Sequence, residues 1–230
     1  MTEIPAQDAP PPYRLDAAHP HLSHAPPPHD YFNPDESVDI HKNDLPHWQQ
    51  GGAWIFVTFR MGDAMPAEKL KQWNRERNEW MTLHPDPWDE QTLWEYHRTF
   101  TERLEHWLDS GEGSCALRDP AVRQVVEKAL LHFEGERYDL DDFVIMPNHA
   151  HVLFRPVNGH VLPKILHSWK SYTGGVINKM IGQSGGFWQE DYWDRLVRSE
   201  NHMNHCRRYI AENPVKAHLG EVEYTWRSKR

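Results

Sequence analysis

Two histidines separated by a single residue are the clearest chemical feature of this 230-residue sequence. His149 and His151 lie in the stretch DDFVIMPNHAHVLFRP, where apolar and β-branched residues predict a strand. Side chains two positions apart on a strand point to the same face, so the imidazoles would project side by side, as a divalent metal site requires. Such a site also needs oxygen ligands from carboxylate, amide, phosphate or water. The alternative is a chance pair in a chain with 17 histidines.

A tyrosine in a polar segment is the second feature. Tyr192 lies in GGFWQEDYWDRLVRSE, after a glycine-rich turn that could expose its hydroxyl for attack on a substrate. The alternative is a half-buried packing role. Tyr172 is the rival nucleophile, whereas Tyr209 lies on a predicted helix and is interpreted as a core residue.

The elements that would position these residues follow a simple order. Residues 53–59 predict a buried strand, and further strands are predicted at 138–146 and 149–154. Helices are predicted at 120–133, 162–180 and 199–212. The last helix is expected to end before Pro214. This order predicts an α+β sandwich with an antiparallel sheet and helices on one face.

The remaining segments lie outside this pattern. Residues 1–46 are rich in proline and histidine, without a periodic apolar face, and predict a flexible arm. Residues 47–230 would form the domain, with a helical insertion at about 61–116. Within it, helices are predicted at 66–83 and 87–110, as an inserted hairpin.

Four motifs in order carry a family resemblance. The stretches MPNHAHVLF, LHSWKSYTGGVINK, FWQEDYWDRLVRSE and YIAENPVKAHL resemble the REP-associated tyrosine transposases, relatives of the single-tyrosine HUH transposases of the smallest insertion sequences. His149-Ala150-His151 matches the His-hydrophobic-His pattern, and the resemblance covers about residues 47–60 and 117–226. It implies a ferredoxin-like fold with helices packed on a central antiparallel sheet. It also implies Mg²⁺ or Mn²⁺, single-stranded or hairpin DNA, and a covalent 5′-phosphotyrosine, here on Tyr192.

The third metal ligand departs from the family pattern. Relatives commonly place a histidine or amide one helical turn after the tyrosine, where this chain has Asp194 and Arg195. Arg195 cannot bind a cation. Asp194 is a tentative ligand, or equally a structural partner of Arg195 or Arg198, and Gln189 is a weaker candidate.

The charge distribution allows contact with DNA through the C-terminal half only. The net charge is −9, but residues 117–230 hold 16 basic and 14 acidic residues, which leaves 9 and 20 for the first 116. The side chains expected to touch DNA, or else to line solvated faces or the core, are Lys170, Arg195, Arg198, Arg207, Arg208 and Trp193.

Three functions remain open at this point. The first is metal-dependent cleavage and rejoining of single-stranded DNA, the second a domesticated protein that binds a DNA hairpin without cutting, and the third a replication-type or conjugation-type nickase. The motifs around Tyr192 and Asn213 favour the transposase branch. Two cysteines and no long apolar segment predict a cytoplasmic protein without a membrane span, which would act as a monomer or homodimer.

Overall fold

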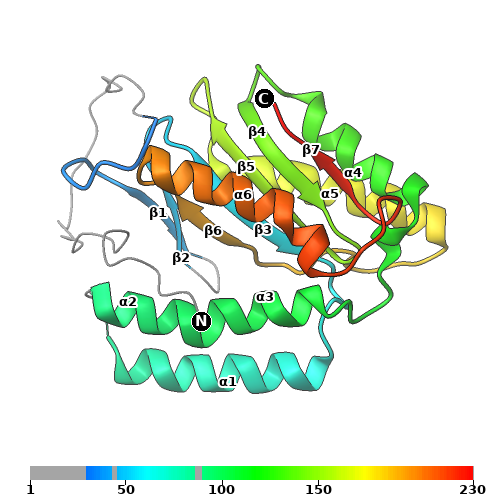
Figure 1. Ribbon diagram of the computed structural model, residues 1–230, viewed down its shortest axis with the longest axis horizontal. Helices are drawn as coiled ribbons and strands as arrows, with labels where there is room; N and C mark the ends of the chain where they lie inside the picture. The colour runs from blue at the N-terminus through cyan, green and yellow to red at the C-terminus, as the bar shows by residue number, and fades with distance from the viewer. Residues whose placement is uncertain (1–29, 43–45, 86–89, 230) are drawn as a thin grey trace.

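The computed structural model describes residues 30–42, 46–85 and 90–229. Its centre is an antiparallel sheet of five strands in the order β6-β3-β5-β4-β7. These strands are β3 (Ile55–Arg60), β4 (Tyr138–Ile145), β5 (His149–Pro156), β6 (Trp193–Leu196) and β7 (Thr225–Arg227). Together with α4 (Pro120–His132) and α5 (Leu162–Ile181), β3 to β6 form the β-α-β-β-α-β order of a ferredoxin-like sandwich (Figure 1). The predicted fold class is confirmed.

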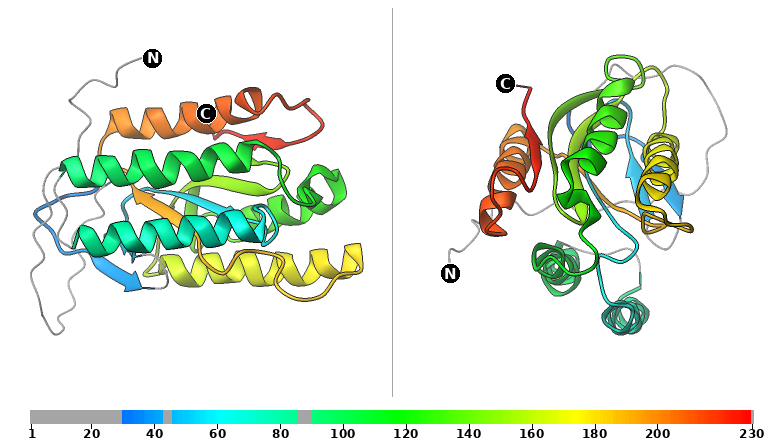
Figure 2. Two further views of the ribbon diagram at one scale, coloured as in Figure 1. Left: turned by 90° about the horizontal axis from the view of Figure 1, so that it is seen from below. Right: turned by 90° about the vertical axis from the view of Figure 1, so that its right-hand side faces the viewer.

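Helices cover both faces of this sheet, not one as the sequence predicted. Figure 2 shows α5 on one face and α6 (Glu200–Lys216) on the other. Alternate residues of β3 serve the two layers: Ile55, Val57 and Phe59 belong to the core beneath α4 and α5, and Phe56 belongs to the core beneath α6. The last helix takes the second face because it carries its own apolar stripe, Met203, Cys206 and Ile210.

Helix α6 continues past Pro214, where the sequence predicted that it would end. Its N-cap is Ser199, whose hydroxyl accepts a hydrogen bond from the His202 amide at 3.1 Å. A proline removes one amide donor from a helix and is least disruptive near a terminus. Here Pro214 lies within the last turn, and only Val215 and Lys216 follow it in the helix. Asn213 is therefore helical.

A pair of helical segments follows β3 and lies alongside the sheet (Figure 1). It consists of α1 (Ala67–Leu83) and the continuous run α2 (Glu90–Tyr96), η2 (His97–Thr101) and α3 (Glu102–Asp109), and η3 (Ala116–Arg118) leads from it to α4. The indole of Trp73 donates a hydrogen bond to the Phe100 carbonyl at 3.2 Å, which ties the two segments together. Nowhere in the described ranges does a helix have the length and apolarity to cross a bilayer.

Regular structure begins within residues 1–46, which the sequence predicted to be a flexible arm. β1 (Asp39–Lys42) pairs with β2 (Pro46–Gln49), and Phe32 is buried, with its amide bonded to the Val197 carbonyl at 2.8 Å. Backbone pairing and burial of this aromatic ring offset the cost of ordering the segment. The rest of the predicted arm, residues 1–29, lies outside the described residues.

Candidate active site

Strand β5 presents His149 and His151 to the sheet face that α6 covers. Their Nε2 atoms are 3.0 Å apart, the ring planes are inclined by 77°, and both side chains are fully buried. The arrangement on one face, predicted from the spacing, is confirmed. Two imidazole nitrogens converge on one point, as two ligands of a single ion must.

The other ring nitrogens bind oxygen atoms of neighbouring side chains. His149 Nδ1 lies 2.7 Å from Asn148 Oδ1, and His151 Nδ1 lies 2.8 Å from Thr58 Oγ1. The Asn148 amide nitrogen already donates to two backbone carbonyls, so its oxygen must accept from His149. This places the His149 proton on Nδ1 and leaves a lone pair on Nε2. Oxygen partners of this kind orient and support metal-binding histidines.

The electrostatic environment keeps both rings neutral. Burial, and then the nearby positive charge of Arg60, lower the pKa of His149 to about 3. Burial and the adjacent His149 hold the pKa of His151 well below its ordinary value. At neutral pH both imidazoles are therefore in the form that can coordinate a metal.

Helix α6 brings a tyrosine to the same face. The ring of Tyr209 lies against that of His151, with centroids 5.2 Å apart and planes at 78°. Asn213 follows one helical turn later, and residues four apart share a helix face. Its side chain is completely buried, and neither amide atom has a hydrogen-bond partner among the described residues.

These groups fit a hard divalent ion. Within the described residues, no third His, Cys, Asp or Glu side chain joins the histidine pair in metal-binding geometry. The Asn213 amide oxygen is an oxygen donor on the same helix as Tyr209 and has no hydrogen bond with any of the described residues. Two imidazoles and an amide oxygen, completed by water or phosphate oxygens, suit Mg²⁺ or Mn²⁺.

Tyr192 lies on the opposite side of the sheet from the histidine pair. In the register of β3 with β6, Thr58 faces Trp193 and Val57 faces Asp194. Thr58 is also opposite His151, so Trp193 lies on the same sheet face as His149 and His151, called the histidine face from here on. Tyr192, one residue earlier, packs instead in the core beneath α4 and α5. The predicted role of Tyr192 as nucleophile is therefore not supported by this placement.

The surroundings of Tyr192 are those of a packing residue. Its ring stacks on His47 at 3.9 Å between centroids, and only 5% of the residue is exposed. Burial, and then Asp194 and Asp191, raise the pKa of its phenol far above the ordinary value. A hydroxyl in this environment is a poorer nucleophile than a free phenol.

Asp194, the tentative third ligand, is engaged elsewhere. Its carboxylate lies 2.5 Å from His47 Nδ1 and accepts the Trp48 amide at 3.2 Å, while Asp191 contacts His47 Nε2 at 2.8 Å. Burial disfavours charge on His47, but the hydrogen bonds to Asp191 and Asp194 prevail and raise its pKa to about 9. The cluster joins β2 to β6, and the strand register directs Asp194 away from His149 and His151.

Two of the predicted DNA-binding side chains share the histidine face. Trp193 and Arg195 project from β6 on that side, with the Arg195 guanidinium 4.7 Å from the Trp193 ring centre. Lys170 is on α5, across the sheet, where it donates to the Glu190 carbonyl and lies 5.6 Å from the Tyr192 ring centre.

The other three arginines lie near or on α6. Arg207 makes a bidentate ion pair with Asp141, at 2.6 and 2.7 Å, and is not available to a phosphate without breaking it. Arg208 is exposed on α6, and Arg198 precedes the helix, with its amide 3.2 Å from His202 Nδ1.

Two residues near the histidine pair that the sequence did not assign to the site are Tyr209 and Asn213. The available signal was their separation by four positions in YIAEN, within a stretch already recognised as family-like. Pro214 predicts the end of the helix at this point, and the apolar pattern predicts a core position for Tyr209, so the sequence does not bring the two together. Tyr172, the rival considered, is 61% exposed on α5 and lies across the sheet.

Comparisons with known proteins match part of this chain to a transposase family. The model of the family described as "Transposase IS200 like" matches residues 117–213, while no curated protein matches the chain. A REP-associated tyrosine transposase bound to a REP hairpin aligns with 76% of this chain and 74% of its own, at 14% identity and a TM-score of 0.41. A candidate transposase from Deinococcus radiodurans R1 aligns with 72% and 93%, at 13% identity and a TM-score of 0.30. Through residues 117–213, which include both histidines, Tyr209 and Asn213, this chain is similar to the IS200-like transposases, as its motifs predicted.

Proposed function

We propose that this protein cleaves and rejoins single-stranded DNA through a covalent bond between Tyr209 and a 5′-phosphate. The family match associates the chain with DNA transposition. The observation that carries the finer proposal is the position of the Tyr209 ring, 5.2 Å from that of His151 and on the same sheet face. Tyr209 replaces Tyr192 in this role because Tyr192 is buried on the opposite face.

His149, His151 and Asn213 would hold Mg²⁺ or Mn²⁺. When bound, the ion neutralises charge on the scissile phosphate and polarises its phosphorus. Thr58 and Asn148 keep the two rings in place through their hydrogen bonds. This restraint limits the freedom that would otherwise be lost on reaching the reactive geometry.

The covalent step exchanges one ester for another. The Tyr209 oxygen forms a bond to phosphorus, the bond from phosphorus to the 3′-oxygen breaks, and that oxygen leaves as a 3′-hydroxyl after taking up a proton. The Tyr209 phenol loses one proton as the new bond forms and the leaving 3′-oxygen takes one up, so the exchange is balanced in protons. A free phenol has a pKa of about 10 and must be activated in the site. A second 3′-hydroxyl can reverse the reaction, so strands are joined without a nucleotide cofactor.

The proposal is tested by incubating the protein and Mn²⁺ with a labelled DNA hairpin that carries single-stranded flanks. A denaturing gel should show a covalent protein–DNA band in the native protein and none in Tyr209→Phe. Tyr192→Phe serves as the control and should still form the band. If the native protein binds the hairpin but never forms the adduct, the non-cleaving DNA-binding function replaces this one.

A further inference from the structure

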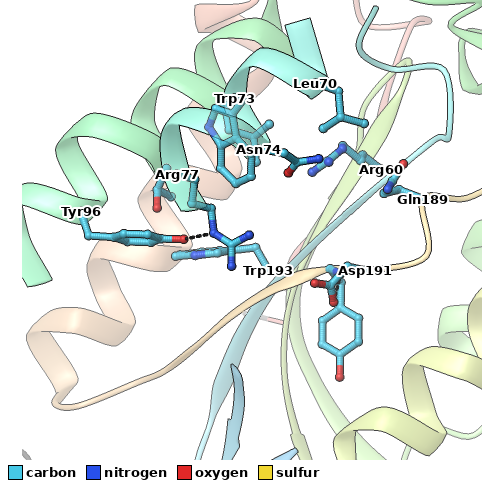
Figure 3. Close-up of a pocket in the computed structure, with 12 residues that line it drawn as sticks. Arg60, Leu70, Trp73, Asn74, Arg77, Tyr96, Gln189, Asp191 and Trp193 are labelled. Carbon is cyan, nitrogen blue, oxygen red and sulfur yellow. Dashed lines mark hydrogen bonds between the residues drawn. The ribbon is translucent and has the colours of Figure 1, made fainter. Parts of the chain in front are cut away.

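A pocket lies between the helical pair, α1 and α2 to α3, and the part of the sheet where β3 ends and β6 begins. Figure 3 shows α1 on one side of it, with Trp73, Asn74 and Arg77, and the ends of the strands on the other, with Arg60 and Trp193. The pocket also reaches Asp191 and Tyr192, and it adjoins the candidate active site through Arg60 and Trp193. Arg60 is the register partner of His149, and Trp193 faces Thr58, which bonds to His151.

Arg60 is the charged group of this pocket that lacks a partner. Its guanidinium makes no hydrogen bond and no ion pair with any of the described residues, although the side chain is partly buried. Burial lowers its pKa to about 10, with Asp191 opposing the change, so it remains charged at neutral pH. A buried cation without a partner is costly, and a planar guanidinium is suited to a phosphate.

The opposite wall is held rigid by contacts already made. The Arg77 Nε donates to the Tyr96 hydroxyl at 3.0 Å, drawn as the dashed line in Figure 3, and its guanidinium lies 5.5 Å from the Trp73 ring centre. Aromatic rings held in place this way can stack with a base of any sequence.

The acidic end of the pocket orients its occupant. Asp191 lines it, and its Oδ2 is buried without a hydrogen-bond partner among the described residues. A carboxylate repels a phosphate but accepts hydrogen bonds from the ring or amino N–H groups of a base. The phosphate of a bound nucleotide would therefore lie toward Arg60, and the base toward Asp191 and Trp193.

We propose that a DNA phosphate next to the scissile one binds Arg60 at the mouth of this pocket, with the adjoining unpaired base against the rim that α1 and Trp193 form. The inference rests on the proposed function, because it places the cleaved strand on the histidine face. It gives the helical pair the role of one wall of the DNA-binding site. It also adds Arg60 to the groups that contact the DNA backbone.

The charge is tested first, in a Tyr209→Phe background so that binding is measured without cleavage. The probe is a fluorescein-labelled oligothymidylate of about 15 nucleotides, within the range that one such groove accommodates. Arg60→Gln should weaken binding about tenfold, as expected for a lost charged hydrogen bond. It should also reduce the slope of log affinity against log salt by about 0.7, the value for one phosphate contact on a single strand. Arg75→Gln, an equal charge loss at an exposed position of α1, should change neither.

A second variant, on α1, tests whether DNA binding needs the open space of the pocket, and it leaves the sheet unchanged. Asn74 lines the pocket and Asn78, one turn later, does not, and both are exposed on α1. Asn74→Trp should fill the pocket and weaken binding of the same probe about tenfold, whereas Asn78→Trp should not. Should Arg60→Gln fail to fold, this pair decides the question. Binding by Arg60→Gln or Asn74→Trp equal to that of its control would overturn the proposal.

The two proposals can fail separately. If the native protein forms the covalent adduct and the pocket variants form it at the native rate with native affinity, the pocket inference is wrong and the function stands. If no adduct forms but DNA binding depends on Arg60 and Asn74 as described, the pocket stands and the cleavage function is wrong.

Discussion

The ring of Tyr209 stands edge-on to the ring of His151, with centroids 5.2 Å apart and planes inclined by 78°. The contact joins α6 to β5, two elements that are distant in sequence. It also places the Tyr209 phenol beside His149 and His151, the pair proposed to hold a metal. The Tyr209 ring also lies near a cation, since Lys216 Nζ is 5.5 Å from its centre.

Tyr209→Phe should reduce cleavage by at least about 10³-fold, because it removes the attacking oxygen and keeps the ring that packs on His151. Binding of single-stranded DNA and Mn²⁺ should be unchanged. Quantified adduct on denaturing gels measures the loss, and a thermal melt checks the fold. Cleavage retained in Tyr209→Phe and lost in Tyr192→Phe would restore Tyr192 as the nucleophile.

Asn213→Leu should separate stability from activity. The buried amide has no hydrogen-bond partner among the described residues, so its replacement should leave the free energy of unfolding unchanged or raise it by about 1–3 kcal/mol. Mn²⁺ affinity and cleavage should both fall, because the proposed third ligand is removed. Denaturant unfolding and calorimetric Mn²⁺ titration give the two quantities.

The contrasting variant is Asn148→Leu. The Asn148 amide donates to the Leu108 and Glu112 carbonyls at 3.2 and 3.1 Å, so this change should destabilise the fold. If Asn213→Leu instead destabilises the protein and leaves cleavage intact, Asn213 is structural and the metal has another third ligand.

Local patterns were sufficient to predict much of this fold. Strands β4 and β5 and helix α5 occupy the residues that their apolar periodicity indicated, and the same-face geometry of His149 and His151 follows from strand alternation alone. Both depend only on residues close in sequence.

The choice of tyrosine could not be made in this way. Whether Tyr192 or Trp193 faces the histidines depends on how β6 pairs with β3, and a shift of one residue would exchange the two faces. That register is set by contacts between segments more than a hundred residues apart. The pairing of Tyr209 with Asn213 was hidden for a different reason, because Pro214 usually ends a helix and here lies inside its last turn.

Thr58→Val should weaken Mn²⁺ binding about 10- to 100-fold, the usual effect of losing a group that orients a metal-binding histidine. The change keeps the shape of the side chain and removes the oxygen 2.8 Å from His151 Nδ1. Thr173→Val is the matched control. Thr173 is also buried, on α5, and bonds to Trp169 and Trp188, so its loss should lower stability but not Mn²⁺ affinity. Equal Mn²⁺ affinity in the two variants would show that Thr58 does not support the site.

His47 should make stability depend on pH in a defined window. Its pKa is raised to about 9 in the folded protein, so its contribution is fully present below the ordinary value of 6.5 and is lost as pH rises through 9. The loss should amount to about 1–3 kcal/mol. Lys170, beside the cluster, acts in the opposite direction: burial lowers its pKa to about 8, so its contribution increases with pH between 8 and 10.5. Between pH 6.5 and 8 only the effect of His47 is expected of these two groups, and the stability of the fold should fall there. Denaturant unfolding across this interval should show the fall in the native protein and its absence in His47→Gln. An equal slope in both proteins would mean that the ion pairs of His47 with Asp191 and Asp194 do not stabilise the fold.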